Sequence, residues 1–122
     1  MITGAVASNF DPVVPLVVRD ANGREQSIHA VVDTGFSGWL ALAKEMISRF
    51  GLPWRREAEA ILANGGSTTF NVHSATIIWD GQPRSVFVDE MESDPLVGMQ
   101  LLHGFRLVIE TFDGGPVRIE HL

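Results

Sequence analysis

The chain has 122 residues, of which 45% are hydrophobic and 20% are charged, an ordinary composition for a soluble globular protein. We therefore expect residues 1–122 to form a single domain. The net charge of -6 and the lack of any lysine and arginine cluster argue against nucleic acid or membrane as a partner. Cysteine is absent, which excludes disulfides, cysteine nucleophiles and thiolate zinc sites. Without a long apolar run or a secretory signal pattern, the expected location is the cytoplasm.

The first half of the chain is predicted to be mostly β-strand. Val13 to Val18 is apolar and β-branched, and the turn-forming residues Asp20 to Gly23 follow it. Gln26 to Val32 resumes an extended pattern. Apolar residues at helical spacing over residues 43–50 then predict one short amphipathic helix, which Gly51 ends.

Three hairpins are predicted in the second half. Their turns are Asn64-Gly65-Gly66, Asp80-Gly81 and Asp113-Gly114-Gly115. The flanking strands are predicted at residues 60–63 and 67–72, 76–79 and 85–88, and 106–112 and 116–120. A second short helix is predicted from Met99 to His103, ended by Gly104. The elements together predict an all-β domain, closed or nearly so, with one or two short helices.

Three short segments are candidates for carrying chemistry. The first, Val31 to Gly38, places the Asp33 carboxylate at the end of an apolar strand, in a turn that glycine allows. The second is the glycine-rich hairpin tip Ala63-Asn64-Gly65-Gly66. The third, Pro95 to Leu102, has two apolar residues and a glycine before a predicted helix. Each is common by itself, as a turn, a surface hairpin or core packing, so the order of the three carries the information.

In this order the segments resemble the retropepsin-like (clan AA) aspartic proteases, and in particular the small prokaryotic group whose active-site turn reads Asp-Thr-Gly-Phe. The resemblance covers nearly the whole chain, from the strand before Asp33 to the closing strand at Val117 to Glu120. It implies a retropepsin-like closed β-barrel, the acid protease fold, with a flap hairpin over the active site.

The resemblance also implies a role for each candidate residue. Asp33 would be the catalytic aspartate, Thr34 would link the two active-site turns of a dimer, and Gly35 would complete the turn. Ala63, Asn64, Gly65 and Gly66 would form the tip of the flap over the substrate. The residues that would support the active site are Phe36, Leu96, Val97 and Gly98.

Two positions depart from the pattern of the family. Phe36 stands where retroviral enzymes have alanine and pepsins have serine, so the hydroxyl that can bond the outer aspartate oxygen is missing. Gln100 stands where aspartate or asparagine is common. Neither departure changes the catalytic carboxylate, although Phe36 is expected to narrow the cleft.

Hydrolysis by the mechanism of this family needs two carboxylates that share one proton. No aspartate besides Asp33 is followed by Thr-Gly or Ser-Gly. The second carboxylate must therefore come from another copy of the chain across a two-fold axis. We expect a homodimer whose interface also uses the strands around Ile2 to Val6 and Val117 to Ile119.

The expected function is that of an aspartic endopeptidase acting on a peptide or protein, without a cofactor. The four histidines are scattered without ligand spacing, so no metal site is expected. No serine has the context of a nucleophile elbow, which argues against a serine hydrolase. The alternative is a catalytically silent dimeric module of the same fold that binds peptide or a partner protein. A third hypothesis is a generic small β-barrel in which the three motifs arose by chance.

Overall fold

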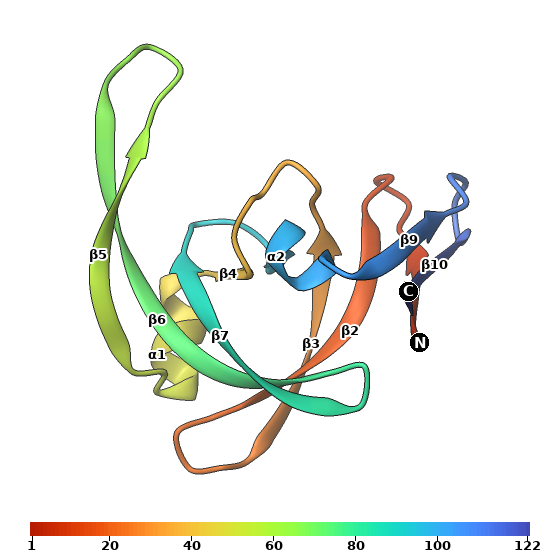
Figure 1. Cartoon of the computed structure of the whole chain (residues 1–122), viewed down its shortest axis with the longest axis horizontal. Coiled ribbons are helices and arrows are strands. Elements are labelled where there is room, and N and C mark those ends of the chain that lie inside the picture. Colours follow the sequence, from red (N-terminus) through yellow and green to blue (C-terminus); the bar gives the residue numbers. More distant parts are fainter.

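The structure is a computed structural model that describes residues 1–122 as ten strands and two short helices (Figure 1). In chain order the elements are β1 (Ile2–Val6), β2 (Pro12–Arg19), β3 (Glu25–Val32), β4 (Leu40–Leu42), α1 (Lys44–Phe50), β5 (Trp54–Ile61), β6 (Ser67–Trp79), β7 (Gln82–Glu90), β8 (Leu96–Val97), α2 (Met99–Leu102), β9 (Phe105–Ile109) and β10 (Pro116–His121). Neither helix has the length and apolarity needed to cross a membrane.

All ten strands belong to one sheet, in the order β5-β6-β7-β4-β8-β3-β2-β1-β10-β9. An additional antiparallel pairing of β6 with β2, at Val17 opposite Ile78, closes six of these strands into a ring. The strand β5 extends one end of the sheet beyond the ring, and β1, β10 and β9 extend the other. The predicted closed β-barrel is confirmed.

The barrel interior is filled by alternate residues of the ring strands. In β2 the buried residues are Val14, Leu16 and Val18, each separated from the next by a less buried neighbour. This period of two is that of a strand with one face on the core. The core is one cluster of 22 buried residues and contains no buried polar or charged side chain. Each aliphatic side chain buried in this way contributes about 1.5–3 kcal/mol to the hydrophobic term.

Two local predictions are confirmed by their backbone geometry. Asp20 closes the β2–β3 turn by accepting hydrogen bonds from the backbone N–H groups of Asn22 and Arg24, at 2.9 and 3.0 Å. The helix α1 ends at Gly51, whose φ of 66° lies in the left-handed region that favours glycine. Both features follow from short-range chemistry, so the sequence alone was sufficient to predict them.

The β5–β6 hairpin is much longer than its predicted strands. The sequence predicted separate strands at 67–72 and 76–79, whereas β6 runs unbroken for 13 residues. It pairs with β5 from Ser67 to His73 and with β7 from Val72 to Trp79, so one strand serves both hairpins. Long-range pairing on both sides therefore overrides the weak local pattern between the two predicted segments.

The last hairpin is wider than predicted, because β9 ends at Ile109 rather than at Phe112. Glu110 to Gly115 form the connection, and Gly115 packs against the Glu110 carbonyl oxygen so closely that an added Cβ would overlap with it. The strand β8, only two residues long, was not predicted, because so short an apolar segment has no periodicity of its own.

Candidate active site

Asp33 lies directly after β3, at the start of the turn that leads to β4. Its backbone N–H donates to the Val97 carbonyl oxygen at 2.9 Å, which fixes the end of the strand. Its Oδ1 accepts a hydrogen bond from the backbone N–H of Gly35 at 2.9 Å. Thr34 and Gly35 are exposed, and the Thr34 hydroxyl makes no hydrogen bond within the chain. The turn thus presents a carboxylate whose position is set by backbone hydrogen bonds.

The strand β8 supports this turn from behind. Val31 and Val32 of β3 pair in parallel with Leu96 and Val97, and β4 pairs antiparallel with the other edge of β8. The two residues of β8 are therefore wedged between the strand that enters the turn and the strand that leaves it. The chain then passes through Gly98 into α2.

Gly98 is buried against the backbone of the turn. Its N–H donates to the Trp39 carbonyl oxygen at 3.0 Å, while the N–H groups of Met99 and Gln100 donate to the carbonyl oxygens of Phe36 and Gly38, at 2.9 and 3.1 Å. A Cβ at Gly98 would overlap with the Gly38 carbonyl oxygen and lie 2.6 Å from Cδ2 of Phe36. Only glycine fits this position, for steric reasons. Gln100, the second departure from the family pattern, thus contacts the turn through its backbone.

The Phe36 ring lies between Gly38 and Gly98. A Cβ added at Gly38 would be 2.6 Å from Cζ of Phe36, and the corresponding atom at Gly98 would meet Cδ2. Both glycines therefore leave room for the ring, which is partly buried. The sequence pattern could not predict this placement, because it depends on the approach of β8 to the turn.

The predicted flap tip lies at the end of the β5–β6 hairpin. Asn64 organises the turn by accepting a hydrogen bond from the Gly66 N–H at 2.9 Å, and the Leu62 N–H donates to the Gly66 carbonyl oxygen at 2.7 Å. Gly65 has a φ of 85°, while Gly66 does not adopt a positive φ. Residues Ala63 to Gly66 are all exposed. In Figure 1 the hairpin rises away from the barrel, on the same side of the view as the turn between β3 and β4.

Asp89 of β7 is a neighbour of the turn that sequence reasoning did not single out. Its Oδ2 would lie 3.2 Å from a Cβ added at Gly38. Desolvation raises the pKa of Asp89 above the ordinary value of an aspartate, while the Arg56 guanidinium partly opposes this rise. The sequence held no signal for this proximity, because Asp89 reaches the turn only through the parallel pairing of β4 with β7.

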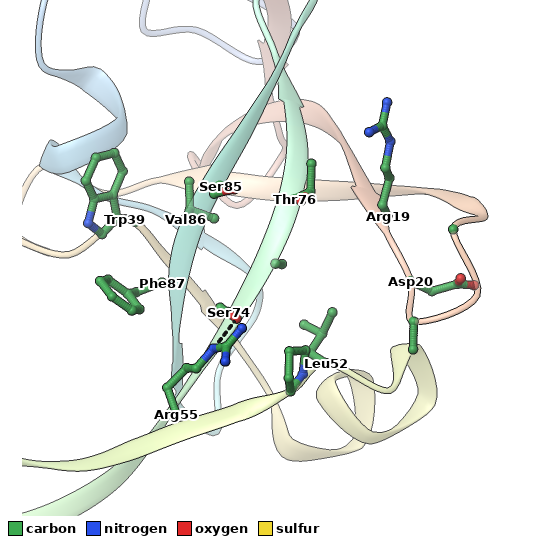
Figure 2. Close-up of a pocket in the computed structure, with 14 residues that line it drawn as sticks. Arg19, Asp20, Trp39, Leu52, Arg55, Ser74, Thr76, Ser85, Val86 and Phe87 are labelled. Carbon is green, nitrogen blue, oxygen red and sulfur yellow. Dashed lines mark hydrogen bonds between the residues drawn. The ribbon is translucent and has the colours of Figure 1, made fainter.

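A cavity of about 590 Å³ lies on the barrel, and none of the predicted site residues lines it. It is bordered by the β2–β3 turn, the start of β5, and the strands β6 and β7. Figure 2 shows its lining, in which Arg55 Nε donates to the Ser74 hydroxyl at 2.8 Å. Trp39, just after the Asp33 turn, forms one wall of this cavity with Phe87.

Comparison with solved structures identifies the architecture. A retropepsin-like aspartic protease from Rickettsia conorii superposes on this chain with a TM-score of 0.61, covering 98% of this chain and 88% of that one, at 20% sequence identity. The chain has a retropepsin-like fold. No protein-family model matches the sequence, and no curated protein matches it either. The predicted fold class is thereby confirmed, and at this level of identity the likeness concerns the fold alone.

Proposed function

We propose that this protein is an aspartic endopeptidase whose active site forms between two copies of the chain, each contributing Asp33. The observation that carries the proposal is the Asp33 turn within a retropepsin-like fold. The carboxylate leaves the end of β3, accepts a hydrogen bond from Gly35 at 2.9 Å, and is backed by β8. A binding module has no need of a carboxylate held in this way.

In the proposed reaction, one Asp33 carboxylate accepts a proton from water as the water oxygen attacks the peptide carbonyl carbon. The other Asp33 is protonated and donates its proton to the carbonyl oxygen. When the C–N bond breaks, one carboxyl group protonates the leaving nitrogen and the other takes a proton from a hydroxyl of the intermediate. The pair of Asp33 carboxyl groups ends with the single shared proton with which it began. This state is favoured because two adjacent carboxyl groups cannot both ionise easily.

The flap supports substrate binding in this proposal. The hairpin tip carries no bulky side chain at Gly65 or Gly66, so its backbone amides can approach an extended peptide. Main-chain pairing between a peptide and a hairpin strand is a general mode of peptide recognition. The exposed tip makes hydrogen bonds only within its own turn, and in this proposal it opens to admit the peptide and closes over it.

The dimer is the second part of the proposal, because one chain supplies only one such carboxylate. The open edge of β9 is the surface best suited to a second copy. The strand β10 is hydrogen-bonded to β1 on one side and to β9 on the other, so it has no edge left for a partner. The expectation that the strands around Ile2 to Val6 and Val117 to Ile119 belong to the interface stays a prediction, and we add β9, which lies beside β10, as the strand with an open edge.

The hydrogen-bonding direction along β9 follows from its neighbours. The Glu110 N–H donates to the Pro116 carbonyl oxygen and the Leu122 N–H to that of Gly104, so even-numbered residues of this segment face β10. The N–H groups of Leu107 and Ile109 therefore point toward the open edge. An apolar edge strand of this kind is a template for antiparallel pairing with a second copy about a two-fold axis.

The Asp33→Asn variant tests the catalytic part. Asparagine keeps the shape of the side chain but can neither accept nor donate the required proton, so peptide hydrolysis should fall by at least about a thousandfold. Cleavage of a peptide library at weakly acid pH would be followed for wild type and variant, with sedimentation to check that the dimer persists. Equal cleavage rates would refute the role of Asp33, and peptide binding by an inactive wild type would identify the non-catalytic module.

The Leu107→Pro variant tests the dimer edge. Proline removes an N–H at the open edge without removing a hydrogen bond to β10, so we expect a folded monomer without activity. Leu107→Ala is the matched control, because it shortens the same side chain and keeps the N–H. Sedimentation and specific activity on dilution would be measured for both. A dimeric, active Leu107→Pro protein would show that the copies associate elsewhere.

A further inference from the structure

The side chain of Asp89 lies where the base of the flap meets the active-site turn. Across the sheet Asp89 is directly opposite Val72 of β6, which is in turn opposite Arg56 of β5. On its other side it pairs with Ala41 of β4. Directly opposed residues project from the same face of a sheet, so the carboxylate stands beside the buried side chains of Val72 and Ala41. Near Gly38 its Oδ2 reaches the active-site turn.

This carboxylate has no partner within the chain. It makes no hydrogen bond, and no cationic group lies within 4.0 Å of it. Burial removes water from the Asp89 carboxylate and raises its pKa, and no hydrogen bond to the ionised form compensates for this loss of water. The neighbouring Glu90, by contrast, faces the other way and lies 3.5 Å from His73 Nε2.

The nearest internal cation is only a partial counter-charge. Arg56 lies two strands away, and its guanidinium sits over the Phe87 ring at 5.7 Å from the ring centre. Phe87 is two residues before Asp89 on the same face of β7 and is 46% exposed. The carboxylate and the exposed ring thus lie on the same face of β7, with the carboxylate next to the turn at Gly38.

We propose that Asp89 selects substrates with a lysine or arginine side chain close to the scissile bond, a specificity that rests on the proposed peptidase function. A cationic side chain would form a charge-assisted hydrogen bond to the unpaired carboxylate, and its alkyl stem would pack on Phe87. Removing the partner of such a bond typically changes discrimination by about tenfold or more.

The test compares wild type with Asp89→Asn in a mass-spectrometric map of cleavage sites in a diverse peptide library. Wild type should show lysine or arginine enriched at one position near the cleaved bond, and Asp89→Asn should lose that enrichment while still cleaving other sequences. In a matched peptide pair, exchange of lysine for norleucine should lower kcat/KM about tenfold for wild type and leave the variant nearly unchanged. Glu90→Gln is the control, since it removes the next carboxylate along the same strand and should retain the preference.

Two results would overturn the inference: cleavage by wild type without basic enrichment, or enrichment that persists in Asp89→Asn. If Asp89→Asn does not fold, Asp89→Thr is used instead, because threonine favours strands. If wild type cleaves nothing, the proposed peptidase function fails, and the same library is passed over immobilised wild type and variant. If wild type retains basic peptides and Asp89→Asn does not, recognition of basic side chains by Asp89 is supported. If both proteins retain them equally, that recognition is refuted.

Discussion

The proposed active-site turn at Asp33 and the predicted flap tip are both loops, yet the structure holds them in opposite ways. The turn after β3 is tied by backbone hydrogen bonds to Val97 and, through Phe36 and Gly38, to the start of α2. The flap tip, Ala63 to Gly66, is bonded only within its own hairpin and is exposed throughout. The proposed chemistry explains the difference, because a reacting carboxylate needs a fixed position and a covering loop has to admit substrate.

The glycines of the two regions differ for the same reason. Gly98 is required because its neighbours leave no room for a Cβ, while its φ of −101° is accessible to any residue. Gly65 has nothing within 4 Å of an added Cβ, and its φ of 85° is what favours glycine. One glycine serves packing and the other serves backbone conformation, so the two should respond differently to substitution.

The largest effect is expected from Gly98→Ala. The new methyl group would overlap with the Gly38 carbonyl oxygen and press on the Phe36 ring, so we expect a loss of about 3 kcal/mol in unfolding free energy and near-complete loss of activity. Urea unfolding and peptide cleavage would measure both. Gly38→Ala is a milder control, because its Cβ would meet side-chain atoms of Phe36 and Asp89, which can move, rather than backbone atoms. We expect it to lower the unfolding free energy by less than Gly98→Ala does. An active, fully stable Gly98→Ala protein would contradict the rigid turn.

A smaller and more selective effect is expected from Gly65→Val at the flap tip. A side chain at this φ costs about 1–2 kcal/mol, and the distorted tip should lower kcat/KM at least tenfold. Gly81→Val is the matched control. Gly81 lies in the turn of the β6–β7 hairpin, remote from the predicted flap, and it has a φ of 78° with nothing within 4 Å of an added Cβ. Similar stability losses with a turnover loss only at Gly65 would support the flap, and equal turnover losses would argue against it.

The smallest effect is expected from Asp89→Asn, where turn and flap meet. Because burial raises the pKa of Asp89, the folded protein holds this proton more tightly than the unfolded chain, and the ionised group destabilises the fold at neutral pH. The variant should therefore melt higher than wild type at pH 7, by on the order of a few degrees.

The stability difference should shrink as the pH falls toward the ordinary value of 3.8, where the wild-type carboxyl group is neutral as well. Thermal melts of both proteins between pH 3 and pH 7 would follow it. A melting difference that is constant with pH would show that Asp89 is adequately solvated or paired in the folded state.

Several local features of the structure follow from interactions between residues close together in the sequence. The Asp20 turn, the Gly51 helix end and the hairpin at Asn64-Gly65-Gly66 each depend on the conformational preferences of a few adjacent residues. The alternating burial of β2 likewise follows from its own pattern. The order of the Asp33 turn, the glycine hairpin and the segment from Pro95 to Leu102 carried the family resemblance that predicted the fold class and made Asp33 the candidate catalytic residue.

The tertiary structure alone decided the features that depend on distant strands. The closure of the ring between β2 and β6 and the approach of Asp89 to Gly38 both join segments far apart in the chain. The open edge of β9 likewise depends on which strand lies beside β10. None of these leaves a local signature, because a strand's own residues specify which face is apolar but not which neighbour it will pair with.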